Sequence, residues 1–195
     1  MEGIEKLMER ALDMKKAGMS EKEIESELHL SAETIHWMLS GRTQSKKPPS
    51  DVFIGWRSIG VRGVRVNMMC EIFADIIKEE AANRRFEFNT VVGLGMNGVP
   101  LAQATASILD KDFAILSINE DTKESKIFSN FAGLKERNVV IVDDVISSGK
   151  TMEAAIEMLD GLHTKAMLGI VIVNKTKKDD IKGVPIRALI RTMIV

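Results

Sequence analysis

The chain of 195 residues is 45% hydrophobic and 28% charged, a composition typical of a folded globular protein with room for one large domain or a domain and a small addition. A formal net charge of −1 excludes a general attraction to nucleic acid or membranes, so any such binding must depend on a local patch. A single cysteine, Cys70, excludes an internal disulfide, and no apolar run is long enough to span a membrane. We therefore expect a cytoplasmic protein that does not bind membranes.

Before residue 40, apolar side chains recur at helical spacing and predict three helices. Ser20 and Glu23 have the spacing of a capping box, so they predict the start of the second helix, and Ser31 predicts the start of the third. With its short turn between two helices, the segment 17–39 resembles the helix-turn-helix of DNA-binding proteins.

The third helix would read DNA in such a motif, because a recognition helix enters the major groove with its N-terminal residues facing the bases. We expect DNA contacts from the exposed side of this helix and from a basic residue beyond it: Ala32, Glu33, Thr34, His36, Trp37 and Arg42. The alternative is a helical addition used for dimerisation or partner binding, in which Trp37 packs between domains.

The helical pattern breaks after the third helix. Residues 40–50 combine helix-ending and basic residues with the pair Pro48-Pro49, which interrupts regular structure. We predict a helix-turn-helix domain at 1–43, a linker at 44–50 and a ligand-binding domain at 51–195.

The predicted ligand-binding domain alternates strands with helices. After a long helix at about 63–84, apolar runs predict strands at 90–95, 113–118, 139–143, 167–173 and 186–190, and helices at 98–109 and 149–162. Such apolar runs are typical of a parallel sheet covered by helices on both faces. The predicted fold class is therefore α/β with a mainly parallel sheet, preceded by a small all-α domain.

The predicted strand at 139–143 leads through two carboxylates into a loop of small residues and then a helix. Small side chains let backbone amides approach a phosphate, and a helix N-terminus adds partial positive charge. Because the two aspartates lie where the predicted strand ends, we expect both to turn toward a ligand and accept hydrogen bonds from a ribose diol. The predicted ribose-phosphate site comprises Asp143, Asp144, Ser147, Ser148, Gly149, Lys150 and Thr151. The alternative is a plain turn in which Asp144 or Ser147 caps the helix.

Residues 139–151 resemble the ribose-5-phosphate loop of the type I phosphoribosyltransferases, and the likeness, closest to orotate phosphoribosyltransferase, covers about 50–195. It implies that the aspartates hold the ribose hydroxyls of phosphoribosyl diphosphate, that the loop holds the 5-phosphate, and that Mg²⁺ accompanies the ligand. It also implies a pyrophosphate loop at Gly95, Met96, Asn97 and Gly98. Orotate enzymes have an aromatic residue and a lysine where this chain has Met96 and Asn97, so a cation that would neutralise pyrophosphate is missing. The alternative is that these glycines serve only a tight turn.

Residues 119–137 match the mobile catalytic loop of these enzymes. In orotate enzymes the loop carries a Lys-x-His-Gly signature, but here it contains no histidine and is rich in acidic residues. Lys123 and Lys126 are candidates for phosphate contacts, and the alternative is a solvated surface segment. We therefore assign no catalytic residue and no metal site of the chain's own, and we expect a domain that binds its ligand without strong transition-state electrostatics.

A helix-turn-helix joined to an orotate-type domain resembles the archaeal regulators of sugar catabolism. The resemblance implies a homodimeric transcriptional regulator that binds double-stranded DNA and senses phosphoribosyl diphosphate or a nucleotide. An active orotate or purine phosphoribosyltransferase, which makes a nucleoside monophosphate and pyrophosphate, is the second hypothesis. An interaction protein that binds no DNA is the third.

Overall fold

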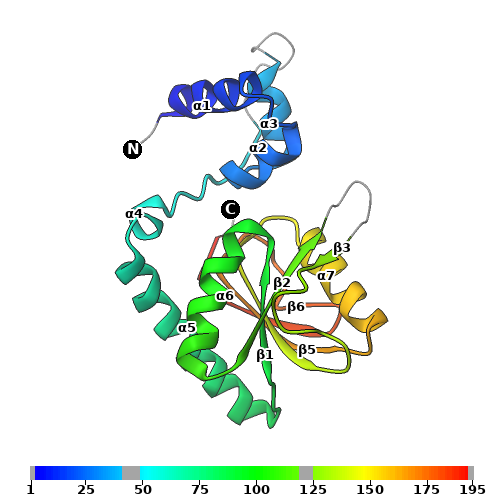
Figure 1. The fold of residues 1–195 in the computed structure, drawn as a ribbon. Helices are drawn as coiled ribbons and strands as arrows, with labels where there is room; N and C mark the ends of the chain where they lie inside the picture. The colour runs from blue at the N-terminus through cyan, green and yellow to red at the C-terminus, as the bar shows by residue number, and fades with distance from the viewer. Residues whose placement is uncertain (1–2, 41–48, 119–124, 193–195) are drawn as a thin grey trace. The chain divides into compact units, whose positions relative to one another are not determined.

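The computed structural model describes residues 3–40, 49–118 and 125–192. The chain divides into a larger unit from Trp56 to Arg191 and a smaller helical unit, which comprises the residues up to Gly55 together with Thr192 (Figure 1). This division falls beyond the linker predicted at 44–50, because two residues after that linker are held by the helical unit. Asp51 accepts hydrogen bonds from this unit, and Phe53 packs against its core.

The smaller unit contains α1 (Ile4–Lys16), α2 (Glu21–Leu28) and α3 (Ala32–Leu39), so the three predicted helices are present. The capping box at α2 is formed, since Ser20 accepts the Glu23 amide and donates its own amide to the Glu23 carboxylate at 2.7 Å. His29 ends α2 with a left-handed φ of +52° and turns the chain toward α3. The helices share a core of apolar side chains: Leu7, Ala11, Ile24, Leu28, Leu30, Ile35 and Met38.

The larger unit is built on a sheet whose described strands follow the order β3-β2-β1-β4-β5-β7-β6. Strands β2, β1, β4, β5 and β7 run parallel, while β3 and β6 pair antiparallel at the two edges. This mainly parallel sheet, together with its helices, confirms the predicted fold class. The strand bounds are β1 (Thr90–Leu94), β2 (Asp112–Ile118), β3 (Ser125–Ile127), β4 (Asn138–Ile146), β5 (Lys165–Asn174), β6 (Asp180–Ile181) and β7 (Val184–Arg191).

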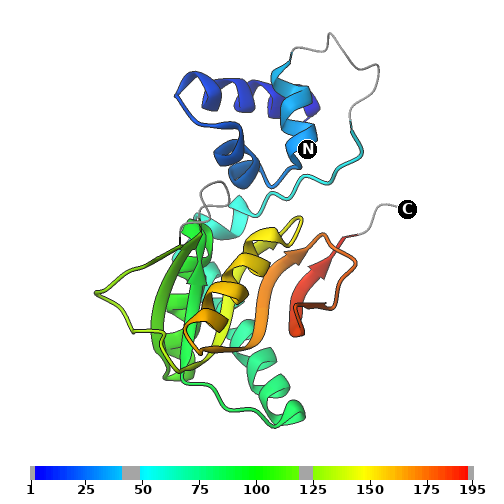
Figure 2. The ribbon, with the colours of Figure 1, turned by 90° about the vertical axis from the view of Figure 1, so that its right-hand side faces the viewer.

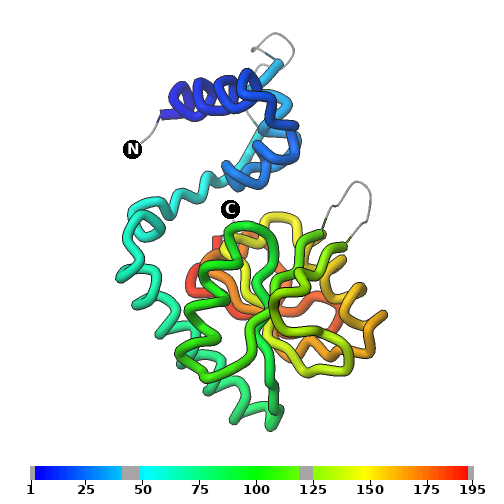
Figure 3. Tube along the Cα trace, in the orientation of Figure 1, coloured from blue at the N-terminus to red at the C-terminus, as the bar shows by residue number. Residues whose placement is uncertain are grey.

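Helices cover both faces of the sheet (Figure 2). The helix α7 (Lys150–Gly161) packs on one face, where Met152, Ile156 and Leu159 join the core. On the other face α6 (Gly95–Leu109) packs against β1 and β4, and α5 (Gly63–Arg84) runs alongside α6 (Figure 3). The short helix α4 (Arg57–Gly60) precedes α5. Among the described helices, none is long and apolar enough to cross a membrane.

One strand departs from the sequence prediction in a way that matters for the site. The prediction ended this strand at residue 143, but β4 continues to Ile146 because its pairing with β5 extends through Val145 and Ile146. Asp143 and Asp144 therefore lie within a paired strand.

Candidate functional site

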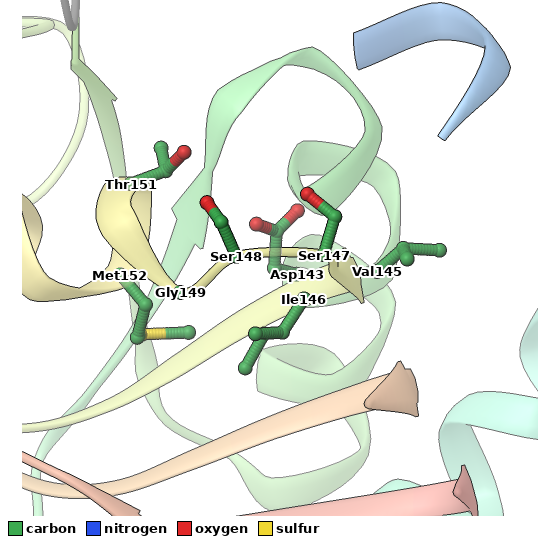
Figure 4. A pocket seen from close by; sticks show the side chains of 8 residues that line it. All are labelled: Asp143, Val145, Ile146, Ser147, Ser148, Gly149, Thr151 and Met152. Atoms are coloured by element: carbon green, nitrogen blue, oxygen red, sulfur yellow. The ribbon is translucent and has the colours of Figure 1, made fainter. Parts of the chain in front are cut away.

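A shallow pocket opens to solvent where β4 ends and α7 begins. Figure 4 shows the side-chain oxygens of Asp143, Ser147 and Ser148 on the same side of the loop that joins these elements. The pocket therefore combines one carboxylate with several hydroxyl groups. It is lined by Asp143, Val145, Ile146, Ser147, Ser148, Gly149, Thr151 and Met152.

The loop at the base of this pocket has the geometry of an anion site. Gly149 precedes α7 with a left-handed φ of +87°, and a Cβ there would lie 3.2 Å from Ile181 Cδ1, so both conformation and space favour glycine. The Lys150 amide donates to the Ser148 hydroxyl at 3.4 Å, at the start of α7. Amides in the first turn of a helix lack partners within the helix and carry partial positive charge, which favours a bound phosphate.

The carboxylate of Asp143 is half-buried at the pocket, where its Oδ1 accepts the Asp144 amide at 2.9 Å. Burial raises the pKa of the Asp143 carboxyl well above its ordinary value, and the negative charge of Asp144 raises it further. A bound group that donates hydrogen bonds, such as a ribose hydroxyl, would stabilise the charged form.

The residues predicted to form the pyrophosphate loop lie in the first turn of α6, which begins at Gly95 rather than at the predicted residue 98. A Cβ on Gly98 would lie 2.6 Å from the Val142 carbonyl oxygen and 3.3 Å from Asp143 Oδ1. Gly98 therefore lets this turn pack directly against β4 beside Asp143. The predicted pyrophosphate loop therefore meets the predicted ribose-phosphate site beside Asp143. The backbone amides in the first turn of α6 lack partners within the helix and can donate hydrogen bonds to a ligand. In the same turn the Met96 side chain is 87% exposed and Asn97 is half-buried.

The structure separates the two aspartates that were expected to face one ligand. Neighbouring residues of a strand point to opposite faces, so Asp143 lines the pocket, whereas Asp144 is buried and only 4% exposed. The Asp144 Oδ2 accepts a hydrogen bond of 2.9 Å from the indole Nε1 of Trp56. Trp56 was not among the predicted site residues, although an indole is a pure hydrogen-bond donor that needs an acceptor when it is covered.

The phosphate contacts expected of Lys123 and Lys126 stay predictions. Lys123 lies outside the described residues. Lys126 is an exposed residue of β3, and its ammonium group lies 4.9 Å from the centre of the Phe128 ring, an arrangement that stabilises the cation at the surface.

On the predicted recognition helix α3, Ala32, Glu33 and His36 are exposed as expected. Thr34 is not, because it is only 5% exposed and donates its hydroxyl to Asp51 at 3.0 Å. Trp37 is half-buried, and its indole nitrogen is buried without a hydrogen-bond partner in the described part of the chain. The remaining candidate, Arg42, falls outside the described residues. The exposed surface of α3 is therefore narrower than predicted.

The larger unit has the fold of solved phosphoribosyltransferases. Orotate phosphoribosyltransferase from Aeropyrum pernix superposes on it with a TM-score of 0.58 and 18% sequence identity, covering 76% of this chain and 82% of that one. The model of the phosphoribosyl transferase domain family matches residues 68–187.

Sequence similarity to whole regulators extends over both units. The transcriptional regulator GfcR of Thermoplasma acidophilum is 40% identical over 195 residues, which cover 100% of this chain and 98% of that protein. The regulator of the same name from Picrophilus torridus is 41% identical and covers 100% of both chains. The chain belongs to the GfcR family. The sequence resemblance to regulators with a phosphoribosyltransferase domain is therefore confirmed, and this GfcR-family chain carries that domain behind a small helical unit.

Proposed function

We propose that this GfcR-family chain is a DNA-binding transcriptional regulator whose phosphoribosyl transferase domain senses phosphoribosyl diphosphate or a nucleotide. The observation that carries the proposal is that 40% identity to a transcriptional regulator extends over the whole chain, which has a pocket lined by a carboxylate and hydroxyl groups at the end of β4. We also propose that the protein acts in the cytoplasm.

In the proposed complex the loop 147–149 and the start of α7 hold the 5-phosphate, and Asp143 accepts a ribose hydroxyl. Among the described residues, no three His, Cys, Asp or Glu side chains are grouped to hold a metal ion. The oxygen atoms at the pocket nevertheless suit a hard cation. Mg²⁺ would therefore be held mainly by the ligand's diphosphate and water, with Asp143 as the protein carboxylate.

An active phosphoribosyltransferase is the second candidate, because the larger unit has the fold of an orotate phosphoribosyltransferase. Met96 and Asn97 supply no cation in the first turn of α6, and removal of one well-placed charge stabiliser typically lowers the rate about a hundredfold or more. We expect turnover with orotate or purine bases far below the ordinary range of roughly 1 to 1,000 per second. A steady-state assay that finds turnover within this range would favour the enzyme.

The DNA contacts are proposed to come from the exposed residues of α3, namely Ala32, Glu33 and His36. Fluorescence anisotropy would measure the affinity of the protein for its own upstream DNA and for shuffled DNA. Each titration is run with and without phosphoribosyl diphosphate and Mg²⁺. Replacement of Glu33 and His36 by Ala should remove the preference for the native sequence and leave ligand binding intact. The matched control is Glu9→Ala, at an exposed position of α1. A wild-type protein without sequence preference in both ligand states would instead be an interaction module.

We further propose that the regulator is a homodimer, since two recognition helices read two half-sites of a pseudo-palindrome. An apolar stripe on α5 supports this arrangement. Its members Val64, Met68 and Ile72 lie on successive turns of the helix and are 52–60% exposed. Such a continuous exposed apolar surface is unusual unless another molecule covers it. A second copy of the chain would bury them. Light scattering should therefore find a dimer in the wild type and a monomer when Met68 and Ile72 are replaced by Lys.

A further inference from the structure

A short segment of the chain is hydrogen-bonded at both of its ends. At the first, Asp51 Oδ2 accepts the Ser31 amide at 2.6 Å and the Thr34 hydroxyl at 3.0 Å, within the smaller unit. At the other, Trp56 Nε1 donates to Asp144 Oδ2 at 2.9 Å, within the larger unit. We call these the Asp51 anchor and the Trp56 anchor. Only residues 52–55 separate them.

The Trp56 anchor occupies Asp144, the second of the two carboxylates that the sequence resemblance assigns to the ribose hydroxyls. Asp144 is 4% exposed, and its Oδ1 already accepts the Val145 amide at 2.8 Å. A ribose hydroxyl can reach such a buried group only if a neighbouring side chain moves. Trp56 is half-buried and donates to Oδ2, so the indole and a ribose hydroxyl would compete for the same oxygen.

The position of the Trp56 ring depends on a glycine in α4. A Cβ on Gly60 would lie 2.8 Å from Cζ3 and 3.2 Å from Cε3 of this ring. The indole therefore lies directly against the backbone of α4, where glycine leaves room for it. An added methyl group at residue 60 would push the ring away.

The residues between the anchors belong to the smaller unit, which extends to Gly55. Phe53 packs against the core of the smaller unit, and a Cβ on Gly55 would lie 2.9 Å from Phe53 Cε1. The backbone up to Gly55 is thus held by packing as well as by the Asp51 anchor. A displacement of Trp56 would act on residues tied to Ser31 and Thr34, at the start of α3.

We propose that Trp56 is a ligand-responsive switch: a ribose hydroxyl bound to Asp144 replaces the indole, and the displaced segment alters the Asp51 anchor at the start of α3. This inference rests on the proposed function, since it specifies how the sensor site regulates DNA binding. The two states differ in a defined contact, as a ligand-driven change requires. The coupling is reciprocal, so DNA that favours the anchored state lowers the affinity for the ligand by the same factor.

Tryptophan fluorescence tests the first step. The chain has two tryptophans, so Trp37→Phe leaves Trp56 as the reporter. Titration with phosphoribosyl diphosphate and Mg²⁺ should shift the Trp56 emission and increase its quenching by acrylamide, with the same midpoint as calorimetry finds. Trp56→Phe removes the donor but keeps a ring, so the ligand should bind about tenfold more tightly or better.

Gly60→Ala displaces the ring while retaining Trp56, and alanine is a better helix former than glycine. We expect this variant to bind phosphoribosyl diphosphate more tightly than the wild type. Gly63→Ala is the matched control, because a Cβ at residue 63 would meet nothing within 4 Å. Its ligand affinity should equal that of the wild type.

The second step is measured as the ratio of the DNA dissociation constants with and without ligand. In the wild type this ratio should differ from one by about 5- to 150-fold, the usual range of allosteric coupling. In Trp56→Phe and in Asp51→Ala it should approach one, and Asp51→Ala should keep the Trp56 fluorescence response.

Two outcomes separate the switch from the proposed function. If the ligand binds without changing Trp56 emission, or if Trp56→Phe keeps the wild-type ligand affinity and DNA ratio, the switch is overturned and the regulator stands. If the wild type binds neither the ligand nor its own upstream DNA selectively, the proposed function and the switch both fail.

Discussion

Replacement of Gly98 by Ala tests the packing of the first turn of α6 against β4, beside the pocket. The added Cβ would lie 2.6 Å from the Val142 carbonyl oxygen, whereas a carbon atom normally stays about 3.3 Å from a carbonyl oxygen. Val142 pairs with both β1 and β5, so β4 cannot yield easily. The start of α6 must therefore move by roughly 0.7 Å, and overpacking of this kind costs about 1 to 3 kcal/mol.

Urea unfolding followed by circular dichroism measures this cost, and calorimetry measures the accompanying loss of ligand affinity. A displaced turn should lose a charged hydrogen bond to the diphosphate, which weakens binding about tenfold or more. Gly161→Ala is the matched control in α7, where a Cβ would meet nothing within 4 Å. There the change should stabilise the fold by about 0.5 to 1 kcal/mol. If both variants are equally stable and bind the ligand equally well, the close approach of α6 to β4 is refuted.

Three further predictions concern stability and pH. Asp143→Asn should stabilise the free protein at neutral pH while weakening ligand binding. The raised pKa of Asp143 means that the folded state binds this proton more tightly than the unfolded chain, so stability falls as the pH rises from the ordinary aspartate range through the raised pKa. The advantage of the variant should therefore vanish in urea titrations at low pH, and an advantage independent of pH would contradict the assignment. Ser20→Ala should lower stability by about 1 kcal/mol through loss of the α2 cap, while the exposed mid-helix control Ser26→Ala should not destabilise. Glu80→Gln should lower the thermal midpoint, because the Glu80 carboxylate holds Arg187 of β7 against α5 at 2.6 Å. An unchanged midpoint would show that this ion pair is dispensable.

The sequence predicted those helices, caps and loops that depend on residues close together in the chain. The helix expected at about 63–84 is α5 with those bounds, and the capping box at Ser20 and the loop at 147–149 were visible because the responsible residues are neighbours in the chain. The fold class followed from the apolar runs.

Features that depend on distant partners could not be predicted in the same way. Thr34 was expected to face DNA, but Asp51, far along the sequence, accepts its hydroxyl and helps to bury it. Asp143 and Asp144 were expected to share a ligand, but pairing with β5 extends β4 and turns them to opposite faces. The Trp56 hydrogen bond to Asp144 joins residues with no local relation.

The two antiparallel strands at the margins of the sheet bear on how the protein behaves at high concentration. Exposed sheet edges can recruit strands from other copies and start fibre growth, and natural proteins blunt them with short strands and charged side chains. Here β3 spans only Ser125–Ile127 and carries Lys126, and β6 spans only Asp180–Ile181. The longer parallel strands are thereby kept in the middle of the sheet, so the protein should resist association through its sheet edges.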